Sequence, residues 1–339
     1  MGANSVREES SEEEKVWEIE PHEVLPGQQN VYIVEKYLAI GKFAKVTQCT
    51  KIGSTEKVAV KAMKKHLRWL AKAEARTMRK LKDFDPDKTN LIRFTEFLEY
   101  NMHGCLAFEL LDISIYDLLN STGNKPLNLY EIQSIAQQVI VAVDTLNSIG
   151  LSHSEMKPNS IMFVNRKEEP LRVKLIDLSL ACNVSGLRLG IKMQPIGYRA
   201  PEVMLGIKLT NTVDMWSLGC IMALMYLGQN LLPHEYTIAK GSKPHPYSDE
   251  IIIFEDMVRL HHEKMNNTEY EDTEPFLNFL KQMLSVDPQE RITPKKALQH
   301  CFIATTKLNP DHLSNSEEDE QKKISSSPNE QDALCKLHF

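Results

Sequence analysis

Seven short motifs along this chain of 339 residues hold the amines and carboxylates that could bind phosphate, bind metal ions or move protons. In sequence order they are Val58-Ala59-Val60-Lys61, Glu74, the run from His153 to Ser160, Asp177-Leu178-Ser179, Ala200-Pro201-Glu202, the run from Asp214 to Gly219, and Arg291. Any one of them has an ordinary structural explanation, since a lysine on a strand or an Ala-Pro-Glu tripeptide is common outside active sites. Any significance of these motifs therefore depends on their combination along the chain.

The first motifs fall in a part of the chain that is predicted to be rich in strands. Runs of β-branched residues separated by turn residues predict strands at 31–38, 46–51 and 57–62. Helix-forming residues predict a helix at 67–81. Two further strands are predicted within 90–111. This part is therefore expected to be a small sheet with one inserted helix.

The later motifs fall in a part that is predicted to be mostly helical. Apolar residues recur at helical spacing from Ile132 to Leu146, and Gly150 follows as a residue that commonly ends a helix. Two short β-rich runs within 161–176 predict a hairpin. Further helices are predicted at 213–227, 276–284 and 294–300. Together the two parts give an α+β fold.

Negative charge is concentrated at the two ends of the chain. Of the net charge of −6, residues 1–20 contribute −5 (seven acids, two bases) and residues 314–339 contribute −3 (six acids, three bases), so residues 21–313 carry +2. Acidic, serine-rich ends favour disorder, which is predicted for 1–30 and 304–339. A nearly neutral centre gives no reason to expect nucleic-acid binding.

Two further features bear on where the protein acts. The apolar stretch 213–227 is too short to span a bilayer, so no membrane association is expected. Six scattered cysteines without a C-x-x-C pair predict reduced thiols in a cytoplasmic or nuclear protein.

The order of the seven motifs resembles the signature set of the protein kinases, over roughly residues 32–303. Within that family, Tyr198–Glu202 and Asp214–Cys220 look most like the homeodomain-interacting protein kinases and their dual-specificity tyrosine-regulated relatives. The small residue after His153 and the stretch Tyr116–Leu119 also resemble the corresponding residues of those kinases. The resemblance implies a bilobal fold, with a small β-rich N-lobe containing one helix at 31–111 and a larger, mostly helical C-lobe at 112–303.

The resemblance also implies ATP and Mg²⁺ as cofactors and gives roles to particular positions. Lys61 would pair the α- and β-phosphates with Glu74 as its partner, and Val46, Ala59 and Met162 would line the adenine site. The implied cofactor-binding positions are Ala39, Gly41, Ala44, Val46, Ala59, Lys61, Glu74, Glu109, Leu111 and Met162. The implied catalytic positions are Glu155 and Lys157, and the implied metal positions are Ser160 and Asp177.

Several of these positions depart from the family pattern. In the glycine-rich loop only Gly41 is kept, so nucleotide affinity is expected to fall without vanishing, because Ala39 and Ala44 add methyl groups near the phosphates. The catalytic aspartate is replaced by Glu155, whose extra methylene would misplace a substrate hydroxyl by about 1 Å and cost on the order of a hundredfold in rate. An equally open alternative is that Glu155 only caps local backbone. The metal-binding asparagine is replaced by Ser160.

Further departures lie in the segment after the second predicted hairpin strand. Ser179 replaces a glycine, which restricts the backbone beside Asp177. The tyrosine that this subfamily phosphorylates on itself falls on Lys192, and the arginine that binds that phosphate falls on Ile196. The family's phosphotyrosine switch therefore cannot order this segment.

Positions that hold the family's structure together are intact. Glu202 and Arg291 match a buried ion pair, and Asp214 matches the aspartate that fixes the catalytic-loop backbone. The fold is therefore expected to be kept whatever the activity.

Two classes of function remain open. The departures favour a pseudokinase or weakly active kinase that binds ATP weakly and signals by docking protein partners. The alternative is an active serine/threonine or dual-specificity kinase that transfers the γ-phosphate of ATP to protein hydroxyls. That alternative is supported by Lys61, Glu74, Lys157 and Asp177, all of which are present.

Overall fold

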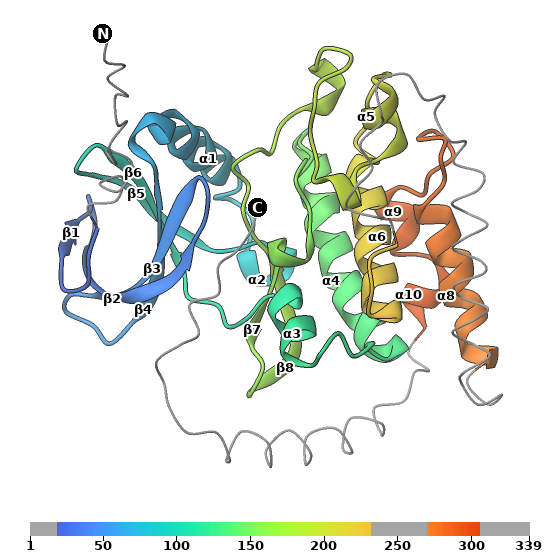
Figure 1. The fold of residues 1–339 in the computed structure, drawn as a ribbon, viewed down its shortest axis with the longest axis horizontal. Helices are drawn as coiled ribbons and strands as arrows, with labels where there is room; N and C mark the ends of the chain where they lie inside the picture. Colours follow the sequence, from blue (N-terminus) through green and yellow to red (C-terminus); the bar gives the residue numbers. More distant parts are fainter. Residues whose placement is uncertain (1–18, 232–269, 306–339) are drawn as a thin grey trace, which may run out of the picture. The chain divides into compact units, whose positions relative to one another are not determined.

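The computed structural model describes residues 19–231 and 270–305 (Figure 1). These residues fall into two compact units. The β-rich unit comprises residues 19–82 and 93–110, and the helical unit comprises residues 83–92, 111–231 and 270–305. A sheet-based unit and a helical unit confirm the predicted α+β fold of the bilobal kinase type.

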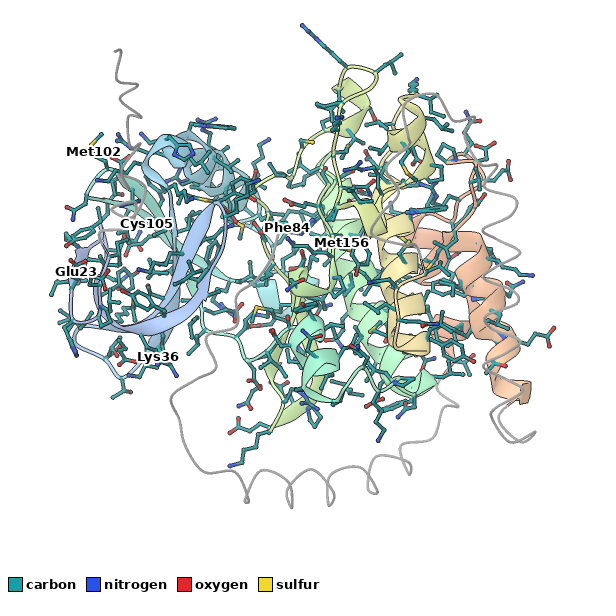
Figure 2. The ribbon with its side chains drawn as sticks, viewed as in Figure 1. Glu23, Lys36, Phe84, Met102, Cys105 and Met156 are labelled. Atoms are coloured by element: carbon teal, nitrogen blue, oxygen red, sulfur yellow. The ribbon has the colours of Figure 1, made fainter. Side chains whose placement is uncertain are left out.

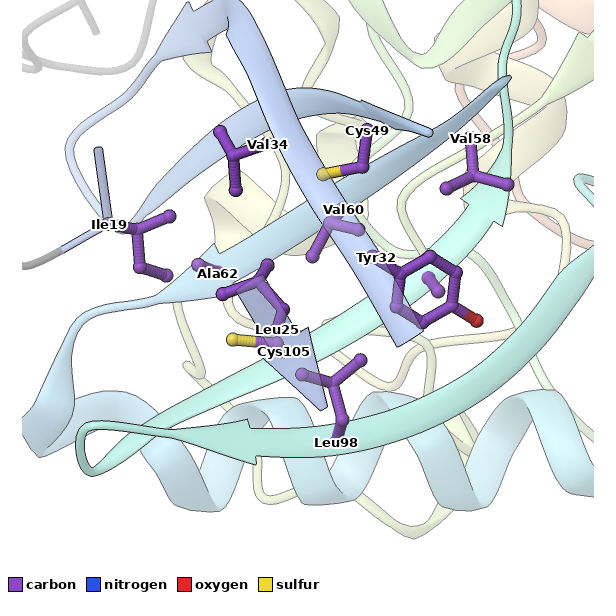
Figure 3. Close-up of a cluster of buried hydrophobic side chains, with 11 residues drawn as sticks. Ile19, Leu25, Tyr32, Val34, Cys49, Val58, Val60, Ala62, Leu98 and Cys105 are labelled. Atoms are coloured by element: carbon purple, nitrogen blue, oxygen red, sulfur yellow. The ribbon is translucent and has the colours of Figure 1, made fainter. Parts of the chain in front are cut away.

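The β-rich unit is an antiparallel sheet of six strands in the order β1-β2-β3-β4-β6-β5. The strands are β1 Val24–Pro26, β2 Val31–Ile40, β3 Ala44–Lys51, β4 Lys57–Met63, β5 Phe94–Tyr100 and β6 His103–Glu109. On β4, Val58, Val60 and Ala62 are buried while Lys61 between them stays partly exposed, because alternate side chains of a strand point to opposite faces. The buried side chains, with Cys105 on β6 (Figure 2), form the core cluster drawn in Figure 3.

Helix α1, Arg68–Lys80, packs against β6, β5 and β4 and agrees with the predicted helix at 67–81. Its close approach to the sheet depends on Gly104, where an added Cβ would lie 2.7 Å from the Cβ of Ala71. The helix buries Glu74 along with its apolar residues. A buried carboxylate needs a partner, and its identity is described below.

The prediction that residues 1–30 are disordered is wrong for residues 19–30. Ile19 and Leu25 are buried in the core of the sheet, and β1 pairs with β2. The following turn is held by the Glu96 carboxylate, which accepts hydrogen bonds from the backbone N–H groups of residues 28–30. Composition averaged over the acidic end hid these two apolar side chains, whose burial orders the segment.

Helix α6, Val213–Leu227, has the bounds that were predicted and lies at the centre of the helical unit (Figure 1). Every residue from Val213 to Tyr226 is buried. Helices α4, Leu129–Ser148, and α8, Tyr270–Met283, pack against it. A helix that is apolar all round is stable only where other elements cover it on every side.

Helix α4 begins at a capping box, in which Asn128 accepts the N–H of Glu131 and the Glu131 carboxylate accepts the N–H of Asn128. It ends just before Gly150, which adopts a left-handed conformation (φ 73°) as expected of a helix-ending glycine. Helix α3, Ile115–Ser121, has the same kind of box at Ser114 and was not predicted. Its seven residues are too few for an apolar period to stand out.

The other elements of the helical unit are short. They are α2 Pro86–Thr89, β7 Ile161–Asn165, β8 Glu169–Leu175, α5 Pro201–Leu205, α9 Pro294–Ala297 and α10 Cys301–Ala304. Strands β7 and β8 confirm the predicted hairpin, whereas α8 starts six residues before the predicted 276. Within the described ranges, no helix combines the length and apolar character that crossing a membrane requires.

Glu202 and Arg291 form the buried ion pair that was predicted. The two Nη atoms of Arg291 donate to the two carboxylate oxygens of Glu202 at 2.6 and 2.9 Å, and neither side chain is exposed. Arg291 also donates to the carbonyl oxygens of Ser285 at 3.0 Å and Thr212 at 3.1 Å. One guanidinium thus ties α5 to the start of α6 and to the end of α8.

We expect Glu202→Gln to destabilise the protein by about 3–5 kcal/mol, because the buried charge of Arg291 loses its counter-ion. Urea unfolding of parent and variant measures this difference. Glu56→Gln is the matched control, since Glu56 pairs with Lys51 at the surface, where removing a partner costs about 0–1 kcal/mol. Equal unfolding midpoints for Glu202→Gln and the parent would contradict the role given to the pair.

Candidate active site

In the β-rich unit, Lys61 on β4 meets Glu74 on α1. The Lys61 ammonium lies 2.9 and 3.1 Å from the two carboxylate oxygens of Glu74, which is 1% exposed. The partner predicted for Lys61 is therefore found. A buried carboxylate holds the ammonium in one place, which is the condition for using it on a phosphate. Phosphate binding by Lys61 itself stays a prediction.

The loop with the pattern of a glycine-rich loop is a tight hairpin between β2 and β3. The N–H of Gly41 donates to the carbonyl of Ala44 at 2.8 Å, and Ala39 pairs with Val46 across the strands. Neither alanine adopts a positive φ, so the added methyl groups fit this backbone without strain.

The remaining cofactor-binding positions are divided between the two units. In the sheet, Ala59 lies on β4, and Glu109 at the end of β6 accepts the N–H of Arg93 through its carboxylate. In the helical unit, Leu111 is buried and Met162 on β7 is partly exposed. Their contact with an adenine ring stays a prediction.

The loop 153–160 of the helical unit is fixed by Asp214, as predicted. The fully buried Asp214 carboxylate accepts the N–H of His153 at 2.6 Å and the N–H of Ser154 at 3.0 Å. Ser154 is held at φ 72°, a strained conformation for a residue with a side chain. Burial raises the pKa of the Asp214 carboxyl, while the electrostatic interaction with His153 and the two N–H donors act in the opposite direction.

Within this loop, the predicted catalytic and metal positions differ in exposure. Glu155 and Lys157 are partly exposed, whereas Ser160 is buried together with Met156, which is labelled in Figure 2. The Ser160 hydroxyl donates to the carbonyl oxygen of Glu155 at 3.4 Å, and the N–H of Ser160 donates to the carbonyl of Lys157 at 2.8 Å. The serine hydroxyl therefore has a structural contact within the loop.

Asp177 follows strand β8 and carries a contact that the sequence did not reveal. Its φ is 63°, and its Oδ1 accepts a hydrogen bond from the Ser179 hydroxyl at 2.8 Å. Ser179 itself does not adopt a positive φ. The expected restriction at this position thus takes the form of a hydrogen bond to the carboxylate, beside the buried Leu178.

A second contact that the sequence did not reveal is the buried side chain of Gln194. Its Nε2 donates to the carbonyl of Val213 and to Ser217 Oγ, both at 2.9 Å, and its Oε1 accepts the N–H of Ala200 at 2.9 Å. The Arg199 guanidinium donates to the Gln194 carbonyl at 2.8 Å. Both polar atoms of the Gln194 side-chain amide therefore have hydrogen-bond partners. These hydrogen bonds attach the segment before α5 to α6 without a phosphate.

The two positions of the family's phosphotyrosine switch are on the surface of the same segment. Lys192 and Ile196 are both exposed. Neither a phosphate acceptor nor a phosphate-binding arginine stands at them, as the sequence indicated. The Gln194 contacts supply an alternative means of ordering the segment.

The donor set available for a metal is small. Among the residues that the structure describes, no three His, Cys, Asp or Glu side chains gather as a metal-binding cluster. Mg²⁺ is commonly held by one or two carboxylates together with substrate phosphates, so Asp177 alone fits a site of that kind. Ser160 would add a hydroxyl where the family pattern has an amide oxygen.

These elements define a protein kinase, and the chain belongs to that family: residues 32–303 match the family model described as "Protein kinase domain". A solved kinase-domain structure covers 85% of this chain and 98% of its own chain with a TM-score of 0.69 and 21% identity, which supports the fold.

The chain is also similar to several curated protein kinases. It is similar to "Homeodomain-interacting protein kinase 2" of Mesocricetus auratus, with 32% identity over 88% of this chain and 30% of that protein. It is also similar to "Homeodomain-interacting protein kinase 1" of Rattus norvegicus (31% identity, 86% of this chain, 29% of that protein). The "DYRK-family kinase pom1" of Schizosaccharomyces pombe is 29% identical over 80% of this chain and 27% of its own length. The chain spans about a third of the length of these relatives.

We expect Gln194→Ala to loosen the segment before α5, because Ala200 loses its acceptor and α6 loses two contacts. Hydrogen exchange followed by mass spectrometry should show faster exchange in peptides covering residues 190–200. Gln299→Ala, at an exposed glutamine of the same unit, is the control and should leave those peptides unchanged. Unaltered exchange in Gln194→Ala would show that the hydrogen bonds of the Gln194 side chain do not order this segment.

Proposed function

We propose that this chain is a protein-kinase domain that binds ATP with Mg²⁺ weakly, transfers phosphate slowly or not at all, and signals by docking protein partners. The proposal rests on the backbone contacts of loop 153–160 and on the residues that it carries. Its backbone is held by Asp214, while Glu155 and Ser160 stand where the family pattern has aspartate and asparagine. A loop whose backbone is fixed but whose reacting groups are altered supports nucleotide binding without efficient phosphate transfer.

The roles of the chain's own residues follow from the reaction of the family, in which a phosphoryl group passes from ATP to a hydroxyl mainly through positioning and charge stabilisation. Lys61, held by Glu74, would bind the α- and β-phosphates. Glu155 would accept the proton of the hydroxyl, and Lys157 would stabilise charge on the transferred group. Mg²⁺, when bound at Asp177, neutralises charge on the phosphates.

Two features limit this machinery. The Glu155 carboxylate is one methylene longer than aspartate, and a displacement of about 1 Å can cost on the order of a hundredfold in rate. The Ser160 hydroxyl is buried and bonded to the loop carbonyl of Glu155, so it is a poorer metal ligand than an amide oxygen. Both limits act on the transition state and leave nucleotide binding to Lys61 and Asp177.

The second candidate is an active serine/threonine or dual-specificity kinase. It is favoured by the intact Lys61–Glu74 pair and by Lys157, which is the residue that serine/threonine kinases place in this loop. We further propose that the kinase N-lobe comprises residues 19–82 and 93–110 and that the C-lobe comprises residues 83–92 and 111–303, in place of the predicted bounds 31–111 and 112–303. The scattered cysteines support a cytoplasmic or nuclear location.

Nucleotide binding is tested by thermal shift. We expect a small rise in the melting temperature of the parent with millimolar Mg–ATP, and no rise in Lys61→Met, because the ammonium that meets the phosphates is gone. Lys36→Met, at an exposed lysine of β2, removes the same charge elsewhere in the sheet and should keep the shift. A parent that shows no shift would refute the proposed nucleotide site.

Phosphotransfer is tested by restoring the family residues. Glu155→Asp combined with Ser160→Asn should raise transfer to a protein substrate by about one to two orders of magnitude. The gain should exceed the product of the two single gains, because both groups act on one transition state. A double variant that binds nucleotide and stays inactive would place the defect outside loop 153–160.

A further inference from the structure

The exposed apolar side chains of the helical unit are concentrated in one stretch. Among its described residues, the large apolar side chains that are exposed all lie between 180 and 207, apart from Tyr116. Four of them flank two glycines: Leu189 is 70% exposed, Ile191 39%, Leu205 52% and Ile207 46%. We call these four side chains the 189/207 patch. Scattered single exposed aliphatics are ordinary, but four on neighbouring turns are a candidate interaction surface.

The two halves of the 189/207 patch lie against each other. A Cβ added at Gly206 would lie 3.2 Å from the Cα of Gly190, so the two backbones are in contact at the glycines. Both glycines have positive φ, 76° at Gly190 and 65° at Gly206, a conformation that side-chain-bearing residues rarely adopt. In Figure 1 the loop before α5 and α5 itself lie side by side at the upper edge of the helical unit. The glycines thus bring the backbones of the two segments that carry the four exposed aliphatic side chains into contact.

The exposed charged residues of the two segments that carry the 189/207 patch have a single sign. Arg188, Lys192 and Lys208 are exposed next to it. From 178 to 213 the only acidic residue is Glu202, which is buried in its ion pair with Arg291. These segments therefore present three cations and no exposed carboxylate.

The family departures contribute directly to this surface. Lys192 stands at the position of the phosphorylated tyrosine, and its side chain adds one of the three cations. Ile196 stands at the position of the phosphate-binding arginine and adds another exposed aliphatic side chain nearby in the sequence. Where the family pattern has a segment controlled by a phosphate, this chain has a basic and apolar one.

We infer that the 189/207 patch docks an acidic segment of a partner protein that carries large aliphatic side chains. The inference rests on the proposed function, in which the chain signals by docking, and it names the class of partner. Carboxylates of the partner would meet Arg188, Lys192 and Lys208, and its aliphatic side chains would cover the patch. Charge pairing of this kind raises the association rate and sets specificity.

Two other occupants fit less well. A second copy using the same patch in a two-fold contact would bring like charges together, because such a contact places one surface against itself. A single-stranded nucleic acid would be bound through stacking on aromatic rings, and the four side chains of the patch are all aliphatic. An acidic, aliphatic polypeptide satisfies both the charge and the apolar surface.

Fluorescence anisotropy with a synthetic probe tests the inference. The probe is a short labelled peptide in which leucine is interspersed among glutamates, titrated with the full chain at low salt. We expect binding that weakens about tenfold or more in Lys192→Glu/Lys208→Glu and in Leu189→Ser/Leu205→Ser, and that weakens as salt is raised. Lys295→Glu and Val24→Ser, at an exposed lysine and an exposed valine elsewhere, should bind the probe as the parent does.

Three results with the probe would overturn the inference. They are no binding by the parent, equal binding by the patch variants and the parent, or binding of a probe whose glutamates are replaced by lysine. Self-association of the parent that Lys192→Glu abolishes, seen in sedimentation velocity, would assign the patch to a second copy and would also overturn it. The thermal shift with Mg–ATP is recorded on every variant, so lost docking with a normal shift is distinguished from failure of the nucleotide site.

Discussion

A carboxylate that is cut off from water must take its hydrogen bonds from the chain, and Asp214 is where the helical unit meets this requirement. Its two oxygens accept the N–H groups of His153 and Ser154, and the second of these residues is held in a left-handed conformation that it would not adopt alone. The donor groups come from loop 153–160 and the acceptor from α6. The position of the loop is therefore tied to a buried helix by these two hydrogen bonds.

Other buried polar contacts also fasten neighbouring segments to α6. Glu202 and Arg291 fasten α5 to the start of α6, and Gln194 fastens the preceding segment to Val213 and Ser217. None of these contacts involves a group that would take part in phosphoryl transfer. Glu155 and Ser160, which differ from the family pattern, make none of these contacts to α6. A fold can be kept while a site changes, because function depends on the site and not on the fold that carries it.

Much of the fold and of the site could be predicted from the sequence, because the patterns that indicated them were long apolar runs or matched pairs of charged residues. The 15-residue apolar run of α6 gave its bounds, and the resemblance to the protein kinases implied the pairs Lys61–Glu74 and Glu202–Arg291, which the structure brings together. What was missed depends on single side chains. Ile19 joins the sheet core from an acidic stretch, and Gln194 becomes a clip only because three distant backbone and hydroxyl groups converge on it. Neither Ile19 nor Gln194 belongs to a periodic pattern in the sequence from which its contacts could be predicted.

We propose that this chain keeps the frame of a kinase while its phosphotransfer is impaired. The most direct test is the turnover of the purified parent chain with saturating Mg–ATP and a generic protein substrate, measured by transfer of labelled γ-phosphate. We expect turnover at least about tenfold below the slow end of the ordinary range of about 1–100 per second. Turnover within that range would contradict it, and would show that Glu155 and Ser160 perform the roles of the aspartate and asparagine that they replace.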